Sequence, residues 1–130
     1  MADVVHVELV AADRTVWSGE ATMVVARTTE GDVGILPNHA PVLSLMVDGI
    51  VEVTTDGNET WVAAVDSGFL SVADNRVSIL SEHAEMSHEI DLEKAKADLE
   101  RVHQTGELLA DAEEAVRRAQ ARIRAVERAR

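Results

Sequence analysis

Residues 30–41 read Glu30-Gly31-Asp32-Val33-Gly34-Ile35-Leu36-Pro37-Asn38-His39-Ala40-Pro41 and contain two of the chain's seven glycines and both of its prolines. Gly31 can adopt the positive φ of a tight turn, and Pro37 and Pro41 each lack the N–H that a central strand donates to its neighbour. Asn38 belongs to a residue type that tolerates a left-handed backbone. The segment therefore cannot be a central strand along its whole length, and by itself it indicates an irregular corner of a β-sandwich.

Short runs with strand character lie on both sides of this segment. In the first run, Val5, Val7 and Leu9 share one face of a strand. The chain turns at Gly19-Glu20, Asp48-Gly49 separates two later runs, and Asp56-Gly57-Asn58 is the strongest hairpin signal. We expect strands over residues 4–10, 15–18, 23–29, 33–36, 42–47, 50–55, 59–65, 69–72 and 76–80. This pattern predicts an N-terminal β-sandwich of about nine to ten strands, mostly antiparallel, over residues 1–84.

After Ala84 the apolar period changes from that of a strand to that of a helix. Ser87 or Asp91 is the candidate N-cap of the first helix, and Gln104-Thr105-Gly106 interrupts the pattern. The two apolar stripes comprise Leu92, Ala95, Leu99 and Val102, and then Leu109, Ala112, Val116, Ala119, Ile123 and Val126. We therefore expect an antiparallel two-helix hairpin over residues 85–130, a separate domain whose alanine-rich second stripe holds it only weakly in a docked position.

Charge is distributed unevenly in a chain whose formal net charge is -12. Residues 1–84 contain 13 acidic residues and three arginines, whereas residues 85–130 contain 11 acidic and nine basic residues. An acidic body repels phosphate backbones, so nucleic acid is not an expected partner.

Composition excludes several kinds of chemistry. The chain has no cysteine, and therefore no disulfide framework, thiolate nucleophile or cysteine-ligated metal site. Its five histidines lack the spacing of metal ligands, and there is no phosphate-binding loop or nucleophile elbow. No apolar run approaches the roughly 18 residues of a membrane span, so we expect any membrane association to go through a partner. Nothing nominates a catalytic centre or a metal site, and we expect a non-catalytic protein without a cofactor.

Two motifs carry a resemblance to a known family. The segment Gly31–Pro41 closely resembles the signature segment of the epsilon subunit of bacterial F-type ATP synthases, with Asn38 where glycine is usual. Asp66-Ser67-Gly68-Phe69-Leu70-Ser71-Val72 resembles the Gly-Gly-Phe segment of the same family, with Ser67 in place of the commoner glycine. A β-sandwich followed by a helical hairpin is the architecture that this family implies, so the resemblance covers nearly the whole chain.

The resemblance implies a rotor subunit of the central stalk, which couples proton-driven rotation to ATP synthesis and inhibits ATP hydrolysis through its C-terminal helices. The implied partners are the gamma subunit, the membrane rotor ring and, when the hairpin is extended, the catalytic alpha/beta head. The implied location is the cytoplasmic face of the cell membrane, as a peripheral part of the complex. By the same resemblance Glu30, Gly31 and Asp32 contact the rotor ring, whereas His39 receives no assigned contact.

Members of this family that bind ATP between the helices carry Ile/Leu-Asp-x-x-Arg-Ala at the start of the first helix. The corresponding residues are Ile90-Asp91-Leu92-Glu93-Lys94-Ala95, so Asp91 and Lys94 are the candidate nucleotide-binding residues. Lysine keeps the charge of the arginine but loses its planar fork. We expect weak or no ATP binding, with Asp91 acting as a helix cap.

The end of the chain is strongly basic. From Val116 onward only Glu127 opposes the arginines, which are Arg117, Arg118, Arg122, Arg124, Arg128 and Arg130. They cannot all belong to the apolar stripe, so we expect them on the exposed flanks of the helix, where they form a basic surface. The resemblance implies that this surface is inhibitory and favours the extended hairpin.

A second function class stays open at this point. The chain could be a free-standing β-sandwich binding module whose hairpin mediates self-association. The scarcity of aromatic residues weighs against it, because small-molecule sites usually have aromatic walls. Co-purification with a coiled-coil partner, rather than a stable homo-oligomer, would distinguish the two.

Overall fold

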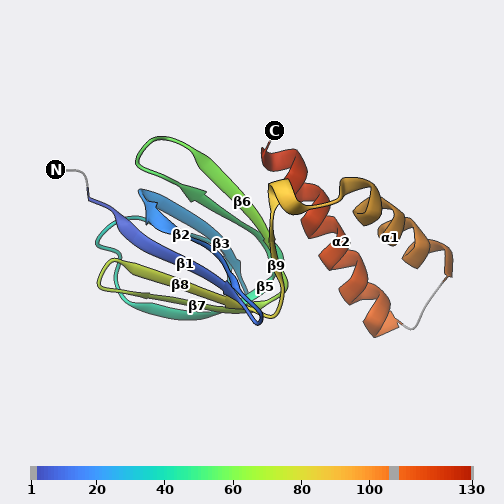
Figure 1. Cartoon of the computed structure of the whole chain (residues 1–130). Helices are drawn as coiled ribbons and strands as arrows, with labels where there is room; N and C mark the ends of the chain where they lie inside the picture. The colour runs from blue at the N-terminus through green and yellow to red at the C-terminus, as the bar shows by residue number, and fades with distance from the viewer. Residues whose placement is uncertain (1–2, 106–108, 130) are drawn as a thin grey trace.

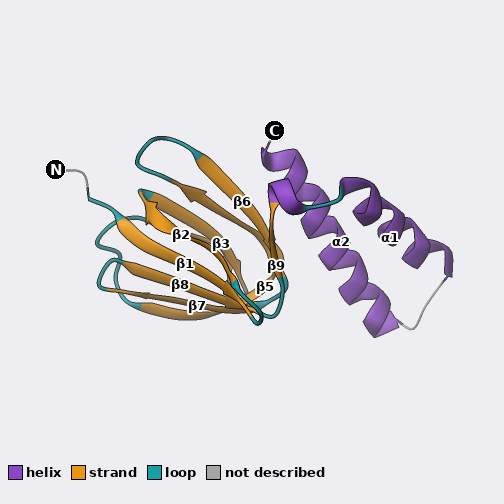
Figure 2. Cartoon of the chain, in the orientation of Figure 1, coloured by secondary structure: helices purple, strands orange, loops and turns teal. Residues whose placement is uncertain are grey.

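The computed structural model describes residues 3–105 and 109–129, with the side chains of 103–105 and 109–112 left out. Nine strands form a β-sandwich and two helices follow it, which confirms the predicted fold class (Figure 1; Figure 2). The strands are β1 (Val5–Ala11), β2 (Thr15–Ala21), β3 (Met23–Thr28), β4 (Gly31–Ile35), β5 (Val42–Thr54), β6 (Thr60–Val65), β7 (Gly68–Ala73), β8 (Arg76–Ser81) and β9 (Ala84–Met86). The helices are η1 (Ser87–Glu89, a 3-10 turn), α1 (Leu92–Thr105) and α2 (Leu109–Ala129).

The long strand β5 joins the two layers of the sandwich. Its first half pairs with β7, which continues through β8 and β1 to β2. Its second half pairs with β3 and β6, which lead to β4 and β9. All of these pairs are antiparallel except β1 with β8. The inward side chains are mainly valine, leucine and isoleucine, among them Leu9, Ile35, Leu70 and Ile79.

Segment 31–41 divides into a short strand and a loop, as expected. β4 pairs with β3 and ends at Ile35, and residues 36–41 form the loop. Asn38 has a φ of 67°, so it does adopt the left-handed conformation predicted for it. Its N–H donates to Oδ1 of Asn75 over 2.6 Å, which fastens the loop to the β7–β8 turn.

The start of β7 explains why a glycine is needed in the second motif. Gly68 has a φ of 133°, and a Cβ on it would lie 1.9 Å from the carbonyl oxygen of Leu80. Ser67 also has a positive φ, of 47°, so the serine occupies a conformation in which glycine is less strained.

Two expected strand breaks are wrong. Gly19 lies inside β2 rather than in a turn, where it leaves room for the indole of Trp17, 2.9 Å from an ideal Cβ. Asp48 and Gly49 lie inside β5 rather than between two strands. The strand pairs with β7 before this point and with β6 after it, so the dipeptide marks the change of layer instead of a reversal.

The connection from sandwich to hairpin is short. β9 pairs with β6 and continues to Met86, two residues beyond the expected end of the sandwich at Ala84. Asp91 caps α1, because its Oδ1 accepts the N–H of Lys94 over 3.0 Å. α2 lies between the sandwich and α1 (Figure 1). Gly106, part of the predicted break between the helices, falls outside the described residues.

Candidate functional site

Small residues bring α2 close to the sandwich. Ala121 and Ala125 are buried against Val62 and Ala64 of β6, with Ile50 and Ile90 packed beside them. Alanine allows two elements to approach closely, because it has no side chain beyond Cβ. The sequence analysis missed this contact, because it identified only the stripe that contains Ala119, Ile123 and Val126. The spacing of Ala121 and Ala125, four residues apart on another face of the helix, was the signal that could have indicated it.

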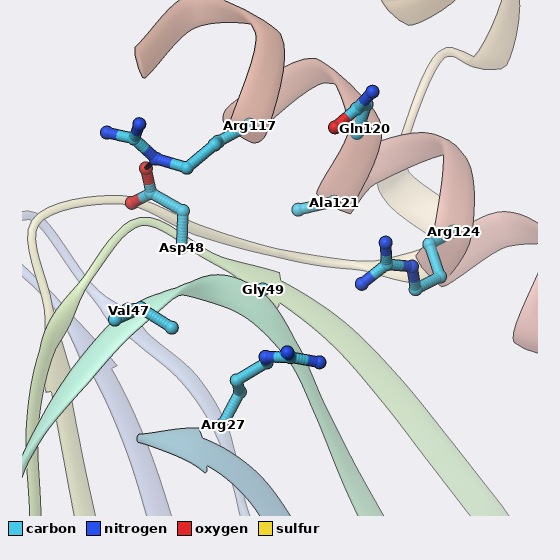
Figure 3. Close-up of a pocket in the computed structure, with 8 residues that line it drawn as sticks. All are labelled: Arg27, Val47, Asp48, Gly49, Arg117, Gln120, Ala121 and Arg124. Atoms are coloured by element: carbon cyan, nitrogen blue, oxygen red, sulfur yellow. Dashed lines mark hydrogen bonds and ion pairs between the residues drawn. The ribbon is translucent and has the colours of Figure 1, made fainter. Parts of the chain in front are cut away.

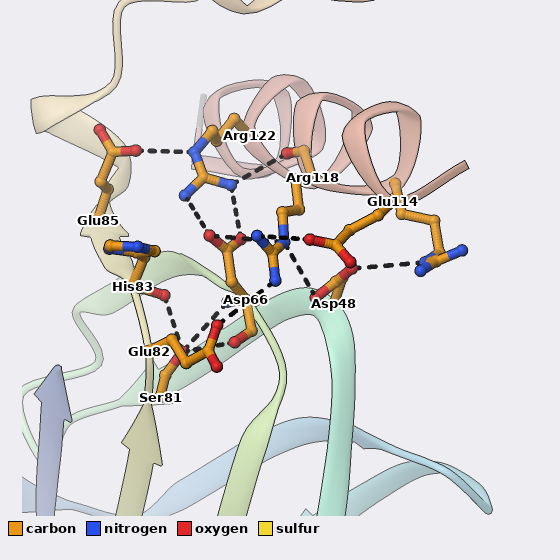
Figure 4. Close-up of polar contacts among 10 residues, drawn as sticks. Asp48, Asp66, Ser81, Glu82, His83, Glu85, Glu114, Arg118 and Arg122 are labelled. Atoms are coloured by element: carbon orange, nitrogen blue, oxygen red, sulfur yellow. Dashed lines mark hydrogen bonds and ion pairs between the residues drawn. The ribbon is translucent and has the colours of Figure 1, made fainter. Parts of the chain in front are cut away.

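Arg122 and Asp66 form a bidentate polar contact between α2 and the sandwich (Figure 4). The guanidinium donates two hydrogen bonds to the two carboxylate oxygens, over 2.8 and 3.1 Å, and its Nε donates to Oε1 of Glu85 over 2.7 Å. Asp66 is only 2% exposed. A fork-to-fork pair with a buried carboxylate fixes the orientation of the helix as well as its distance.

Arg118 extends this contact toward the other end of α2. Its Nε lies 3.7 Å from Asp48 and 3.8 Å from Asp66, and its Nη1 lies 2.9 Å from Glu114 on the same helix. Because those two distances exceed a hydrogen bond, the buried Nε of Arg118 has no hydrogen-bond partner in the described part of the chain. We call Asp48, Asp66, Glu85, Arg118 and Arg122 the docking cluster.

The sequence predicted that all the arginines of α2 lie on exposed flanks of the helix, but only some of them do. Arg118 and Arg122 are half-buried at the sandwich, so that expectation is wrong for these two. Arg117, Arg124 and Arg128 are exposed, as predicted. Arg117 pairs with Asp48 over 3.4 Å and Arg128 pairs with Glu52. Arg130 lies outside the described residues. Acidic residues of the sandwich thus meet a basic helix of the same chain.

Electrostatics support these contacts. Burial alone would lower the pKa of Arg122, but its hydrogen bonds to Asp66 and Glu85 outweigh that and raise the pKa. At η1, the hydrogen bond from Arg14 and the N–H of Met86 lower the pKa of the Glu89 carboxyl. Arg14 donates to Glu89 over 3.0 Å, so the turn before β2 holds η1 in place.

The residues assigned to the rotor ring lie at the β3–β4 turn. Glu30 and Asp32 are exposed, and Gly31 has a φ of 108°. The hydroxyl of Thr28 accepts the N–H of Glu30 over 3.1 Å and donates to the carbonyl of Gly31 over 2.8 Å, which makes the turn rigid. His39 lies beyond the other end of β4, where its Nδ1 is 2.7 Å from the carbonyl of Ala40.

The candidate nucleotide residues lie together at the start of α1. Asp91 and Lys94 line a cavity of about 170 Å³ with Glu85, Glu89 and Asp98. Lys94 forms an ion pair with Asp98 over 3.2 Å. The cavity is rich in carboxylates, which oppose phosphate binding, and Arg122 is the other cation on its wall. Within the described residues no group of acids or histidines has the arrangement of a metal site.

An exposed apolar row crosses the β1–β8–β7–β5 layer. Leu45 pairs with Phe69, Phe69 with Leu80, and Leu80 with Val10. Leu45, Phe69 and Leu80 are 54%, 50% and 51% exposed. We call these four residues the apolar row. An aligned row of this kind on an outer face is typical of a surface that another protein covers. The sequence analysis missed it, although the apolar residues at outward positions of the four strands were a readable signal.

A shallow groove of about 540 Å³ continues the apolar row toward the sandwich end that carries the β3–β4 turn. Ala12, Thr29 and Ser67 line it together with Leu45 and Phe69. Thr29 directly precedes Glu30, so the apolar row and the β3–β4 turn form neighbouring parts of one surface.

None of the helices in the described ranges is long and apolar enough to cross a membrane.

Comparisons with known proteins agree on one family. Residues 4–87 match the family model described as ATP synthase, Delta/Epsilon chain, beta-sandwich domain. The chain is 53% identical over 126 residues to the ATP synthase epsilon chain of Streptomyces avermitilis, covering 97% of this chain and 98% of that one. It is 51% identical over 124 residues to the protein of the same name from Rhodococcus jostii, covering 95% and 96%.

Solved structures share the fold. A chain in the mitochondrial ATP synthase of Euglena gracilis, solved as OSCP/F1/c-ring, superposes with a TM-score of 0.82 at 24% identity, covering 99% of this chain and 82% of that one. A chain from the central stalk and c-ring of the Tetrahymena thermophila enzyme gives a TM-score of 0.54 at 17% identity, with 96% and 95% covered.

Proposed function

Since the chain belongs to the ATP synthase delta/epsilon family, we propose that it is the epsilon chain of an F-type ATP synthase and works as a non-catalytic rotor subunit of the central stalk. The relatives that bear this name match it over nearly their whole length. The observation that supports an assembled subunit best is the apolar row, because a monomer gains nothing from exposing a phenylalanine and two leucines in line.

We assign two contacts within the complex. The apolar row faces the gamma subunit, and the exposed β3–β4 turn with Glu30 and Asp32 faces the polar loops of the membrane rotor ring. The groove that joins them supports this arrangement, because neighbouring surfaces can engage two adjacent subunits of one rotor. The chain then lies on the cytoplasmic side of the membrane and reaches it only through these partners.

The hairpin regulates ATP hydrolysis in this proposal. In the docked position α2 covers β5 and β6, and in the extended position it reaches the catalytic head and blocks it. The docking cluster supports a change between two discrete states, because a specific ion-paired contact is either made or lost. Rotation during ATP synthesis is coupled through the sandwich, whose contacts do not depend on the hairpin.

Co-purification of variants with the synthase tests the proposal. Phe69→Gln and Leu45→Gln, each in the otherwise complete complex, should reduce the amount of this subunit retained with the rotor. Met23→Gln is the matched control, because Met23 is an exposed apolar residue on β3, outside the row. Equal retention of all three variants would contradict the assignment, and a stable homo-oligomer with no synthase partner would favour the free-standing module.

A further inference from the structure

A third cavity, of about 360 Å³, opens between the sandwich and α2 (Figure 3). Arg117, Gln120 and Arg124 line it from α2. Arg27 lines it from β3, and the floor is Gly49 of β5. The guanidinium groups of Arg27 and Arg124 extend into the space between the two elements from opposite sides (Figure 3).

The positive charge in this cavity is only partly neutralised. Arg27 lies 3.8 Å from Asp32, which exceeds a hydrogen bond, and Asp48 is shared between Arg117 and Arg118. No acid pairs with Arg124 in the described part of the chain. Three guanidinium groups thus line one cavity, in a chain with a net charge of -12, and among the described residues Asp48 is the one carboxylate on its wall.

The stem of Arg27 packs across β5 at Gly49. An ideal Cβ on this buried glycine would lie 3.4 Å from Cβ of Arg27 and 3.6 Å from its Cδ, which is ordinary van der Waals contact. From this position the guanidinium of Arg27 extends into the space between β5 and α2 (Figure 3).

We propose that this cavity binds a small polyvalent phosphate anion of the size of pyrophosphate. Guanidinium forks match phosphate oxygens, and several of them at one cavity suit an anion with more than one negative charge. The amide of Gln120 adds a neutral donor. An acidic peptide fits less well, because beyond the cavity it would lie along residues 1–84, where 13 acidic residues face three arginines.

Binding at this place stabilises the docked hairpin. Arg27 belongs to the sandwich and Arg117 and Arg124 to α2, so an anion held by both exists only while α2 is docked. A ligand that binds one of two states shifts the equilibrium toward that state. The site is separate from the cavity of Asp91 and Lys94, and the inference does not depend on the chain's role in a synthase.

Titration calorimetry of the complete isolated chain with pyrophosphate tests the proposal, with orthophosphate as the weaker, less charged probe. We expect one site per chain. Arg27→Gln and Arg124→Gln should each weaken pyrophosphate binding about tenfold or more, the cost of losing a hydrogen bond to a charged group. Arg76→Gln removes one charge from an exposed arginine of β8 outside the cavity and should leave the affinity unchanged. Pyrophosphate should also slow amide hydrogen exchange in α2.

Several results would overturn the inference. One such result is that calorimetry detects no heat of binding when the native chain is titrated with pyrophosphate to millimolar concentration. Equal weakening by Arg76→Gln would indicate diffuse attraction, and weakening by Lys94→Gln alone would place the anion at the start of α1. Tighter binding of a polyglutamate peptide than of pyrophosphate would make the occupant a protein. Arg124 makes no ion pair with any residue that the structure describes, so Arg124→Gln should remain folded, and circular dichroism checks this.

Discussion

Asp66 is held in place before α2 reaches it. Its N–H donates to the hydroxyl of Ser81 over 3.2 Å and to the carbonyl of His83 over 3.0 Å, and the same hydroxyl donates to the carbonyl of Asp66 over 3.0 Å (Figure 4). The backbone at the β6–β7 turn is therefore rigid whether or not the helix is docked. A preorganised carboxylate loses little entropy when Arg122 binds to it.

Replacing Asp66 should release the hairpin from the sandwich. Asp66→Asn removes the carboxylate that accepts two hydrogen bonds from Arg122, and leaves the guanidinium half-buried without its main partner. We expect a loss of about 2 kcal/mol or more of docking free energy. Faster amide exchange in α2, with unchanged exchange in β1 and β8, is the measurement.

Asp56→Asn is the matched control, because Asp56 lies exposed in the β5–β6 turn. A double-mutant cycle with Arg122→Gln should show that the two substitutions at the ion pair are not additive. Additive effects, or equal exchange in Asp66→Asn and Asp56→Asn, would mean that the pair does not hold the helix.

Glu89 makes the position of η1 dependent on pH. The pKa of its carboxyl is lowered, first by the hydrogen bond from Arg14 and then by the N–H of Met86. A lowered pKa in the folded state gives stability that is present above the ordinary pKa, 4.5, and is lost as the pH falls through the lowered value. Glu89→Gln should therefore be less stable than the native chain at pH 7, and the difference should begin to shrink below pH 4.5 and vanish once the pH is below the lowered pKa. Thermal melting at several pH values tests this, and a difference that persists in acid would contradict it.

At the scale of elements, α2 has two packing faces instead of one. Ala119 lies toward α1, whereas Ala121 and Ala125 lie against β6. The helix is therefore the middle layer between the sandwich and α1, and its alanines set how closely it approaches on both sides.

Enlarging the alanine at the sandwich should displace α2. Ala125 is fully buried, so Ala125→Leu has no room and should cost about 1–3 kcal/mol of docking free energy. Ala129→Leu makes the same change at an exposed position of the same helix and should cost almost nothing. Hydrogen exchange of α2 compares the two variants, and equal protection in both would show that the contact tolerates a larger side chain.

The elements also show what the sequence could and could not predict. Alternation of apolar residues predicted strands at β1 to β8 but not the short β9, and Asn38 and Asp91 were predicted correctly because a left-handed turn and a helix cap depend on local chemistry. The continuous β5 could not be predicted, because an Asp-Gly pair reads as a turn unless the partner strands are known. The docking cluster joins residues far apart in the chain, such as Arg122 and Asp66 at a separation of 56, and no local pattern connects them.

At the scale of the whole molecule, the acidic sandwich and the basic helix complement each other within one chain. We predict that the sandwich folds without the hairpin, because its apolar core is made of strand residues alone. A fragment should end after Met86, so that β9 keeps its pairing with β6. Cooperative melting with a β-type circular dichroism spectrum is the expected result, and an unfolded fragment would mean that the helices complete the core.

The same arginines can serve two competing surfaces. In the docked hairpin Arg118 and Arg122 bind acids of the sandwich, and in the proposed extended state they would be free to face the catalytic head. Neutralising all the arginines weakens both states at once, so it cannot decide between them. A substitution on the sandwich side removes this ambiguity, because it weakens docking and leaves the basic helix unchanged.

Asp66→Asn and truncation after Gln104 should therefore change ATP hydrolysis by the assembled synthase in opposite directions. Asp66→Asn favours the extended hairpin and leaves every arginine in place, so the rate of ATP hydrolysis should fall. If the docked and extended states are equally populated, a change of about 1.4 kcal/mol in the docking free energy shifts the ratio of the two populations tenfold. Truncation removes α2 and should raise hydrolysis. Asp56→Asn should leave the rate unchanged. If Asp66→Asn raised the rate as truncation does, the docked hairpin would be the inhibitory state, and equal rates in all complexes would remove the hairpin from regulation altogether.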